Sequence, residues 1–160
     1  MSRILISACL LGAPVRYDGR AKTLHDTLIP RWQAEGRLVP LCPEVAAGLP
    51  TPRAPAEIAP GATAAQVLAG AGRILTDTGA DVTAAFVAGA GLALRIAREQ
   101  GCAYALLTDA SPSCGSLEIH AGHHNGRRIA GRGVVAEHLI AQGIRVFAPS
   151  QIAALAACLD

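Results

Sequence analysis

This chain has few aromatic residues and almost no net charge. Phe, Trp and Tyr make up only 3% of the 160 residues, and 14 basic against 12 acidic side chains leave a formal net charge of +2. Stacking of single-stranded bases requires aromatic rings, and a nucleic-acid surface requires a cationic patch. Nucleic acid is therefore an unlikely partner. Apolar residues reach 51%, which excludes an intrinsically disordered chain and predicts a single domain over residues 1–160.

The chain also lacks a long apolar run. The stretch Val82–Leu94 is broken by Thr83, Gly89 and Gly91 and is shorter than the roughly 20 residues that a membrane-spanning helix needs. Near the N-terminus, the residues around Cys9 look like a lipoprotein cleavage box, but too few residues precede them for a signal peptide. We therefore expect a cytoplasmic protein with no membrane partner.

The chain has no C-x-x-C pair, and its number of cysteines is odd. The five are Cys9, Cys42, Cys102, Cys114 and Cys158. A secreted scaffold held by disulfides fits this pattern poorly. In a reducing cytosol, cysteines serve as small buried apolar residues, as metal ligands or as reactive thiols. The two common glycine-rich nucleotide-binding motifs are missing as well.

Apolar segments alternate with helical patterns along the chain. The predicted strands are 3–8, 37–41, 102–108 and 144–147, and the predicted helices are 24–35, 84–100, 133–141 and 149–158. Two hairpins are predicted besides these, one pairing 56–58 with 73–76 around a loop or short helix, the other pairing 117–120 with 127–129. This alternation predicts a single-domain, Rossmann-like α/β fold of three layers, with a mainly parallel sheet and helices on both faces.

Three of the cysteines follow predicted strands. Cys9 and Cys42 come just after the first and second, and Cys114 lies in the loop after the third. Because ligands of open α/β sheets bind at the carboxyl ends of strands, we expect these thiols to converge there. Three thiolates suit zinc or an iron–sulfur cluster with one open position. Partly buried thiols without a metal fit the spacing equally well. Cys102 and Cys158 are expected to lie away from this site.

Polar residues accompany the three cysteines. Glu44 lies two residues after Cys42, where a carboxylate could activate water beside a metal, and the hydroxyls of Ser111 and Ser113 precede Cys114. Each has an ordinary structural alternative: Glu44 as a charge at a helix N-terminus, and Ser111 as a cap before Pro112.

Loop residues are expected at the rim of the same site. Arg16, Tyr17 and Asp18 follow Cys9, and Arg53 follows Cys42 among prolines. Polar side chains on such loops are candidates for substrate contact. The adjacent pair His123 and His124 is predicted at a hairpin tip, where solvated histidines are more common than ligands.

Motifs across nearly the whole chain resemble the thiouracil desulfidase family, a small bacterial family long described as a domain of unknown function. The motifs that carry the resemblance are Ser7-Ala8-Cys9-Leu10-Leu11-Gly12, Arg16-Tyr17-Asp18-Gly19, Cys42-Pro43-Glu44, Gly48-Leu49-Pro50-Thr51-Pro52-Arg53, Ala56-Glu57-Ile58 and Ser111-Pro112-Ser113-Cys114-Gly115. One stretch, residues 119–126, departs from the family pattern, so the substrate could differ from thiouracil.

The resemblance implies an oxygen-sensitive [4Fe–4S] cluster held by Cys9, Cys42 and Cys114. One iron stays open and acts as Lewis acid and sulfur acceptor in removing sulfur from a thiocarbonyl without net redox change. It further implies that Glu44 activates water and that Ser111 assists proton transfer, while Ser113 bonds locally. Ser113 is also expected among the substrate-binding residues. The substrate would be a small thiolated heterocycle. The competing hypothesis is a non-catalytic zinc or thiol protein that uses the same cysteines, and the oligomeric state stays open.

Overall fold

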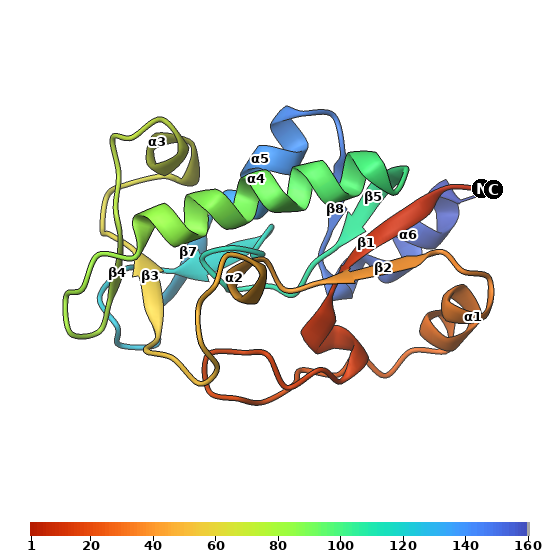
Figure 1. Cartoon of the computed structure of the whole chain (residues 1–160), viewed down its shortest axis with the longest axis horizontal. Helices are drawn as coiled ribbons and strands as arrows, with labels where there is room; N and C mark the ends of the chain where they lie inside the picture. The colour runs from red at the N-terminus through yellow and green to blue at the C-terminus, as the bar shows by residue number, and fades with distance from the viewer. Residues whose placement is uncertain (160) are drawn as a thin grey trace.

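Four parallel strands form the central sheet of the computed structural model, which describes residues 1–159 (Figure 1). The strands are β1 (Arg3–Ser7), β2 (Leu38–Leu41), β5 (Cys102–Leu106) and β8 (Arg145–Phe147), in the order β2-β1-β5-β8. The chain leaves β1 toward β2 on one side and later returns to β5 on the other. The loops after β1 and β5 therefore diverge, which opens a crevice at the carboxyl edge of the sheet.

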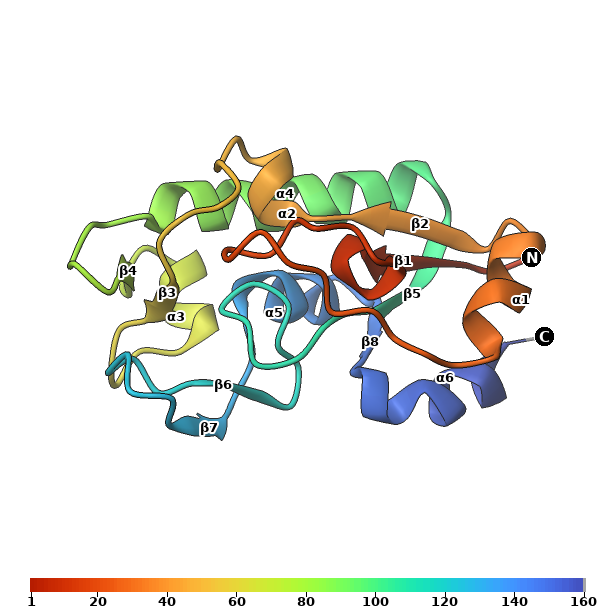
Figure 2. The same ribbon diagram turned by 90° about the horizontal axis from the view of Figure 1, so that it is seen from below.

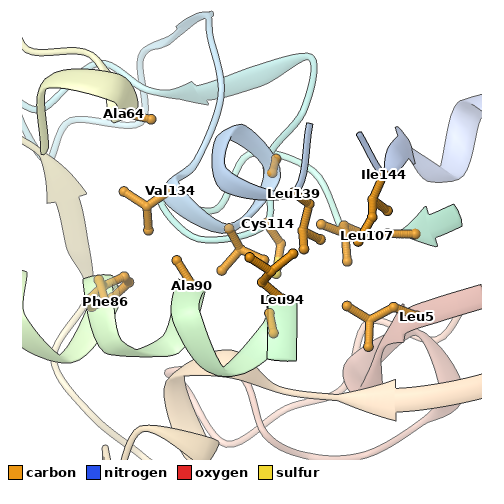
Figure 3. Close-up of a cluster of buried hydrophobic side chains, with 14 of the residues drawn as sticks. Leu5, Ala64, Phe86, Ala90, Leu94, Leu107, Cys114, Val134, Leu139 and Ile144 are labelled. Carbon is orange, nitrogen blue, oxygen red and sulfur yellow. The ribbon is translucent and has the colours of Figure 1, made fainter. Parts of the chain in front are cut away.

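Side chains of β1 alternate between two cores, one on each face of the sheet. Leu5 belongs to the core beneath α4 (Thr83–Glu99) and α5 (Val134–Ala141), which includes Leu94 and Leu139 (Figure 3). Ile4 and Ile6 belong to the core beneath α1 (Leu28–Ala34) and α6 (Ile152–Cys158). The period of two in a strand explains this division. The three-layer α/β architecture is confirmed.

Close packing of α4 positions the helix that begins at the second cysteine. Helix α2 (Pro43–Ala46) follows β2, with Pro43 in its first turn, where the missing N–H costs nothing. A Cβ on Gly89 of α4 would lie 2.8 Å from the carbonyl oxygen of Pro43. Only glycine permits this approach, so α4 fixes the place of α2 and of the residues beside it.

Two small hairpins lie beyond the carboxyl ends of the sheet strands (Figure 2). Strands β3 (Ala56–Ile58) and β4 (Ile74–Thr76) are antiparallel and enclose α3 (Ala64–Leu68). Strands β6 (Glu118–His120) and β7 (Arg128–Ala130) form the second hairpin. Both hairpins are confirmed, and the segment between β3 and β4 contains a short helix capped by Thr63.

Two helices differ from the sequence expectation. Helix α1 begins at Leu28, not at residue 24, because the carboxylate of Asp26 accepts the N–H of Leu28 and ends the preceding loop. The C-terminal segment begins as a 3₁₀ turn, Pro149–Gln151, before α6. A second 3₁₀ turn, Ala8–Leu11, follows β1. Among residues 1–159, no helix has the length and apolar character to cross a membrane.

Candidate active site

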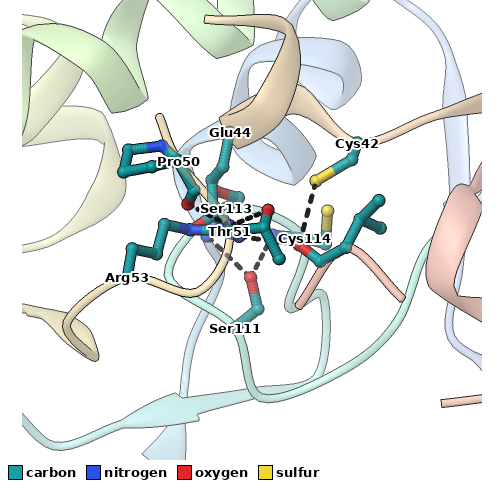
Figure 4. Close-up of polar contacts among 9 residues, drawn as sticks. Cys42, Glu44, Pro50, Thr51, Arg53, Ser111, Ser113 and Cys114 are labelled. Carbon is teal, nitrogen blue, oxygen red and sulfur yellow. Dashed lines mark hydrogen bonds and ion pairs between the residues drawn. The ribbon is translucent and has the colours of Figure 1, made fainter. Parts of the chain in front are cut away.

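Cys9, Cys42 and Cys114 line one cavity of about 370 Å³ at the carboxyl edge of the sheet. Cys9 lies in the 3₁₀ turn after β1, Cys42 is the residue before α2, and Cys114 lies in the loop after β5. Figure 4 shows Cys42 and Cys114 together with Glu44, Arg53 and the two serines. The expected convergence of these three cysteines is therefore observed.

The thiols of Cys9 and Cys114 both have raised pKa values in this cavity. Burial raises the pKa of Cys114, and the charges of Glu44, Cys9 and Cys42 raise it further. Burial and the neighbouring Cys42 also raise the pKa of Cys9, while Arg16 and Lys22 oppose this. Three thiolates so close together repel one another in a poorly solvated place. A cationic group bound among them would offset that repulsion.

Thiols that line one cavity can bind a single metal ion or an iron–sulfur cluster. Thiolates that share one zinc ion all lie about 2.3 Å from it. The ligands of a cubane bind different irons and stand farther apart, and clusters take Cys thiolates as their usual donors. Three thiols around one cavity therefore suit a [4Fe–4S] cluster with one open iron.

The other two cysteines lie elsewhere. Cys102 begins β5, at the amino end of the sheet, and is buried. Cys158 ends α6, where its sulfur accepts a hydrogen bond from the Arg145 guanidinium at 3.2 Å. Neither lines the cavity of the three thiols.

Glu44 projects into the wall of this cavity from the first turn of α2 (Figure 4). Burial raises the pKa of its carboxyl, while the charge and hydrogen bond of Arg53 and the nearby Ser113 hydroxyl lower it in part. Arg53 Nε lies 3.4 Å from Glu44 Oε1. Glu44 thus combines both interpretations from the sequence, a charge at a helix N-terminus and a carboxylate beside the thiols.

Arg53 also lines the cavity, but the protein itself occupies most of its N–H donors. Its Nη1 donates to the carbonyl of Pro50 at 3.1 Å and to the Thr51 hydroxyl at 3.2 Å, and Nη2 donates to the carbonyl of Val15 at 3.1 Å. The Val15 carbonyl also accepts a hydrogen bond from Cys42 Sγ at 3.9 Å. Arg53 therefore joins the loop after Cys9 to the loop after α2 and anchors Glu44.

Of the two serines before Cys114, Ser111 both lines the cavity and bonds to the local backbone, whereas Ser113 does not line the cavity. The Ser111 hydroxyl accepts the backbone N–H groups of Ser113 and Cys114, both at 3.0 Å, and Ser111 lines the cavity. Ser113 is buried beside Glu44, and its hydroxyl has no aligned hydrogen-bond partner among residues 1–159. The expectation that Ser113 is the locally bonded serine is wrong, because the turn directs the Ser111 oxygen back at its own backbone.

The loop after Cys9 contributes Arg16 and Tyr17 to the cavity, with the Arg16 guanidinium 5.8 Å from the centre of the Tyr17 ring. Asp18 does not line the cavity. Its carboxylate accepts the N–H of Arg20 at 3.0 Å and lies 3.9 Å from Arg16, so it shapes the loop that carries the other two residues.

Sequence reasoning missed Asp109, which organises the loop of the third cysteine. One carboxylate oxygen of Asp109 accepts the N–H groups of Ala110, Ser116, Leu117 and Glu118. Burial alone would raise the pKa of Asp109, but these donors lower it. Asp109 directly follows the predicted strand 102–108, and this position could have identified it as a candidate site residue.

His120, His124 and Glu57 also line the cavity and were not chosen as site residues from the sequence. Glu57 stands in the motif Ala56-Glu57-Ile58, and the histidines stand in the stretch that departs from the family pattern. The choice of His123 and His124 as solvated residues is right only for His123, which is exposed.

Comparisons with known proteins show the family of this chain. The family model for 2-thiouracil desulfurase matches residues 4–151. The chain is 39% identical over 149 residues to YbbK, an uncharacterized protein of Bacillus subtilis (strain 168), covering 93% of this chain and 97% of that one. A solved structure of the [4Fe–4S]-dependent thiouracil desulfidase TudS is similar with a TM-score of 0.89 and 44% identity, over 98% of this chain and 97% of that one. This chain belongs to the 2-thiouracil desulfurase family.

Proposed function

We propose that this protein is a [4Fe–4S]-dependent desulfidase, acting as a single domain, that hydrolyses the thiocarbonyl of a small thiolated heterocycle such as thiouracil. The observation that carries the proposal is the meeting of three thiols and one carboxylate around a single cavity. The 44% sequence identity between this chain and TudS supports the same conclusion. In the overall reaction, water replaces the sulfur: a C=O bond forms, the C=S bond breaks, and hydrogen sulfide is released with no change in oxidation state.

Cys9, Cys42 and Cys114 would hold the cluster through their thiolates. When bound, the cluster supplies a Lewis-acidic iron whose open position suits a soft sulfur atom. The ligating thiols must be reduced, which agrees with the cytoplasmic location expected from the cysteine pattern.

Glu44 would take the proton of the attacking water. Its carboxylate lies in the cavity wall, and Arg53 fixes its position. Ser111 would supply a proton to the departing sulfur. The Ser111 oxygen already accepts two backbone N–H groups, so the hydroxyl proton is available for donation into the cavity.

The rest of the cavity wall would bind the heterocycle. Arg16 and Tyr17 line the cavity directly, Asp18 shapes their loop, and Arg53 and Ser113 support Glu44 from behind. A cavity of about 370 Å³ must hold both the cluster and the substrate. This limited volume favours a small ring as the substrate.

The decisive experiment is turnover of 2-thiouracil by protein purified and reconstituted without oxygen. We expect equal amounts of uracil and sulfide, with no added electron donor. A protein loaded with about four irons per chain that forms neither product would contradict the proposal. Stoichiometric zinc without labile sulfide would instead favour the structural or regulatory alternative.

A further inference from the structure

A single buried carboxylate holds the tip of the β6–β7 hairpin against the cavity. Glu57 of β3 accepts the backbone N–H of Gly122 at 2.8 Å and that of His124 at 3.3 Å through the same oxygen. Its second oxygen lies 3.3 Å from Nδ1 of His124, and only 10% of the Glu57 side chain is exposed. A Cβ on Gly122 would lie 2.6 Å from the carbonyl oxygen of Ile58, so the two hairpins are in close contact.

His124 adopts a backbone conformation that is unusual for a residue other than glycine, with φ at 51°. Such a conformation persists where the surroundings hold it, as Glu57 does here. His124 lines the same cavity as the three thiols, and 22% of its side chain is exposed. Its neighbour His123 is exposed and does not line the cavity.

The two nitrogens of the His124 imidazole lie in different surroundings, and only Nδ1 is placed beside Glu57. Nδ1 is sealed from solvent near Glu57, though the contact lacks hydrogen-bond alignment. His120, on the same wall, has a sealed Nδ1 with no partner among residues 1–159. Each of these two imidazoles therefore has one nitrogen turned into the protein, while the residue itself lines the cavity.

Glu57 stands beside Nδ1 of His124, where its charge bears on the tautomer of the imidazole. A carboxylate beside Nδ1 favours the proton on that nitrogen, which leaves Nε2 as a hydrogen-bond acceptor. A cyclic thioamide such as thiouracil carries ring N–H groups next to its thiocarbonyl carbon. An acceptor on the cavity wall matches such a donor.

We propose that His124 binds the substrate by accepting a ring N–H at Nε2, and that Glu57 is the positioning residue for this imidazole. This assignment rests on the proposed function for its substrate class. It gives the stretch that departs from the family pattern a role in selecting rings with a free N–H over N-alkylated ones.

The experiment is calorimetric titration of anaerobically loaded protein with uracil, 1-methyluracil and 3-methyluracil, which requires no turnover. His124→Ala should weaken uracil binding roughly tenfold, the effect of one lost hydrogen bond. The wild type should bind one of the methylated rings roughly tenfold more weakly than uracil, and His124→Ala should largely remove that difference. His123→Ala is the matched control and should behave as the wild type.

Glu57→Gln tests the positioning role, because it retains an oxygen for the two backbone N–H groups but removes the charge. It should weaken uracil binding several-fold in the wild-type background and have no further effect when combined with His124→Ala. Additive effects of the two substitutions would overturn the role of Glu57.

Unchanged uracil affinity and unchanged methyl discrimination in His124→Ala would overturn the inference about His124, as would a loaded wild type that binds none of the three rings. If the expected binding pattern appears but 2-thiouracil yields no sulfide, the proposed function fails and the binding assignment stands. If sulfide is released but His124→Ala binds uracil normally, only the binding assignment fails.

Discussion

Arg53 and Glu44 form a largely buried ion pair across the wall of the cavity, with 3.4 Å between Nε and Oε1 and only 7% and 16% of the two side chains exposed. The two residues come from different segments, α2 and the proline-rich loop after it (Figure 4). Arg53 therefore has a structural role, whereas Glu44 is the proposed base. Substitution of Arg53 should mainly affect stability, and substitution of Glu44 should mainly affect sulfide release.

Arg53→Ala should lower the free energy of unfolding by about 3–5 kcal/mol, because it leaves the Glu44 carboxylate buried without its partner. The double variant Arg53→Ala/Glu44→Gln should recover part of this loss, since the unpaired charge is gone. Urea denaturation measures both values. Equal stability of the single and double variants would show that the ion pair contributes nothing and that only the bonds of Arg53 to backbone carbonyls matter.

Glu44→Ala should keep its iron and lose sulfide release, because the activation of water is removed while the three cysteines remain. Iron analysis and sulfide assay of the anaerobically prepared variant measure both properties. Glu99→Ala, at the exposed end of α4, is the control and should retain both. Loss of iron in Glu44→Ala would mean that this carboxylate is a ligand or a support of the cluster.

Ser111→Ala should lower the rate of sulfide release by roughly 10²–10⁴-fold, the effect of losing a proton-transfer group, with the iron content unchanged. It should also cost about 1 kcal/mol of stability, because two backbone N–H groups lose their acceptor. Ser113→Ala removes a hydroxyl without an aligned partner and should cost less stability. Full activity in Ser111→Ala, with loss only in Ser113→Ala, would reverse the assignment of the two serines.

Asp109 should make the fold more stable at neutral than at acidic pH. Its pKa is lowered in the folded state, so its contribution is present above the pKa of an unfolded Asp, about 3.9, and is lost as the pH falls through the lower folded value. Asp109→Asn should therefore destabilise the protein at pH 7 more than at pH 3. Urea denaturation at both values, with exposed Asp77→Asn as control, measures this difference; an equal effect at both would contradict it.

The sequence was sufficient to predict the parallel sheet and the gathering of its cysteines. Cys9, Cys42 and Cys114 each follow an apolar strand, and the carboxyl ends of parallel strands necessarily share one edge. The same reasoning correctly excluded Cys102, which stands at the beginning of a strand. These predictions succeed because strand direction alone decides where each residue lies.

Contacts between distant segments escaped sequence reasoning. Glu57 reaches Gly122 across 65 positions in the chain, and no local pattern encodes how two hairpins pack. The orientation of Ser111 depends on the backbone angles of a short turn, which residue types did not determine. Side-chain direction in loops and the docking of one hairpin on another are properties of the folded chain.

In the proposed enzyme, Cys9, Cys42 and Cys114 together hold one [4Fe–4S] cluster. The test is iron and labile sulfide analysis of anaerobically prepared Cys→Ser variants, made at all five cysteines. We expect about four irons per chain for the wild type, Cys102→Ser and Cys158→Ser, and loss of most iron and labile sulfide when Cys9, Cys42 or Cys114 is replaced. Full iron in any of these three variants, or loss in either of the other two, would contradict it.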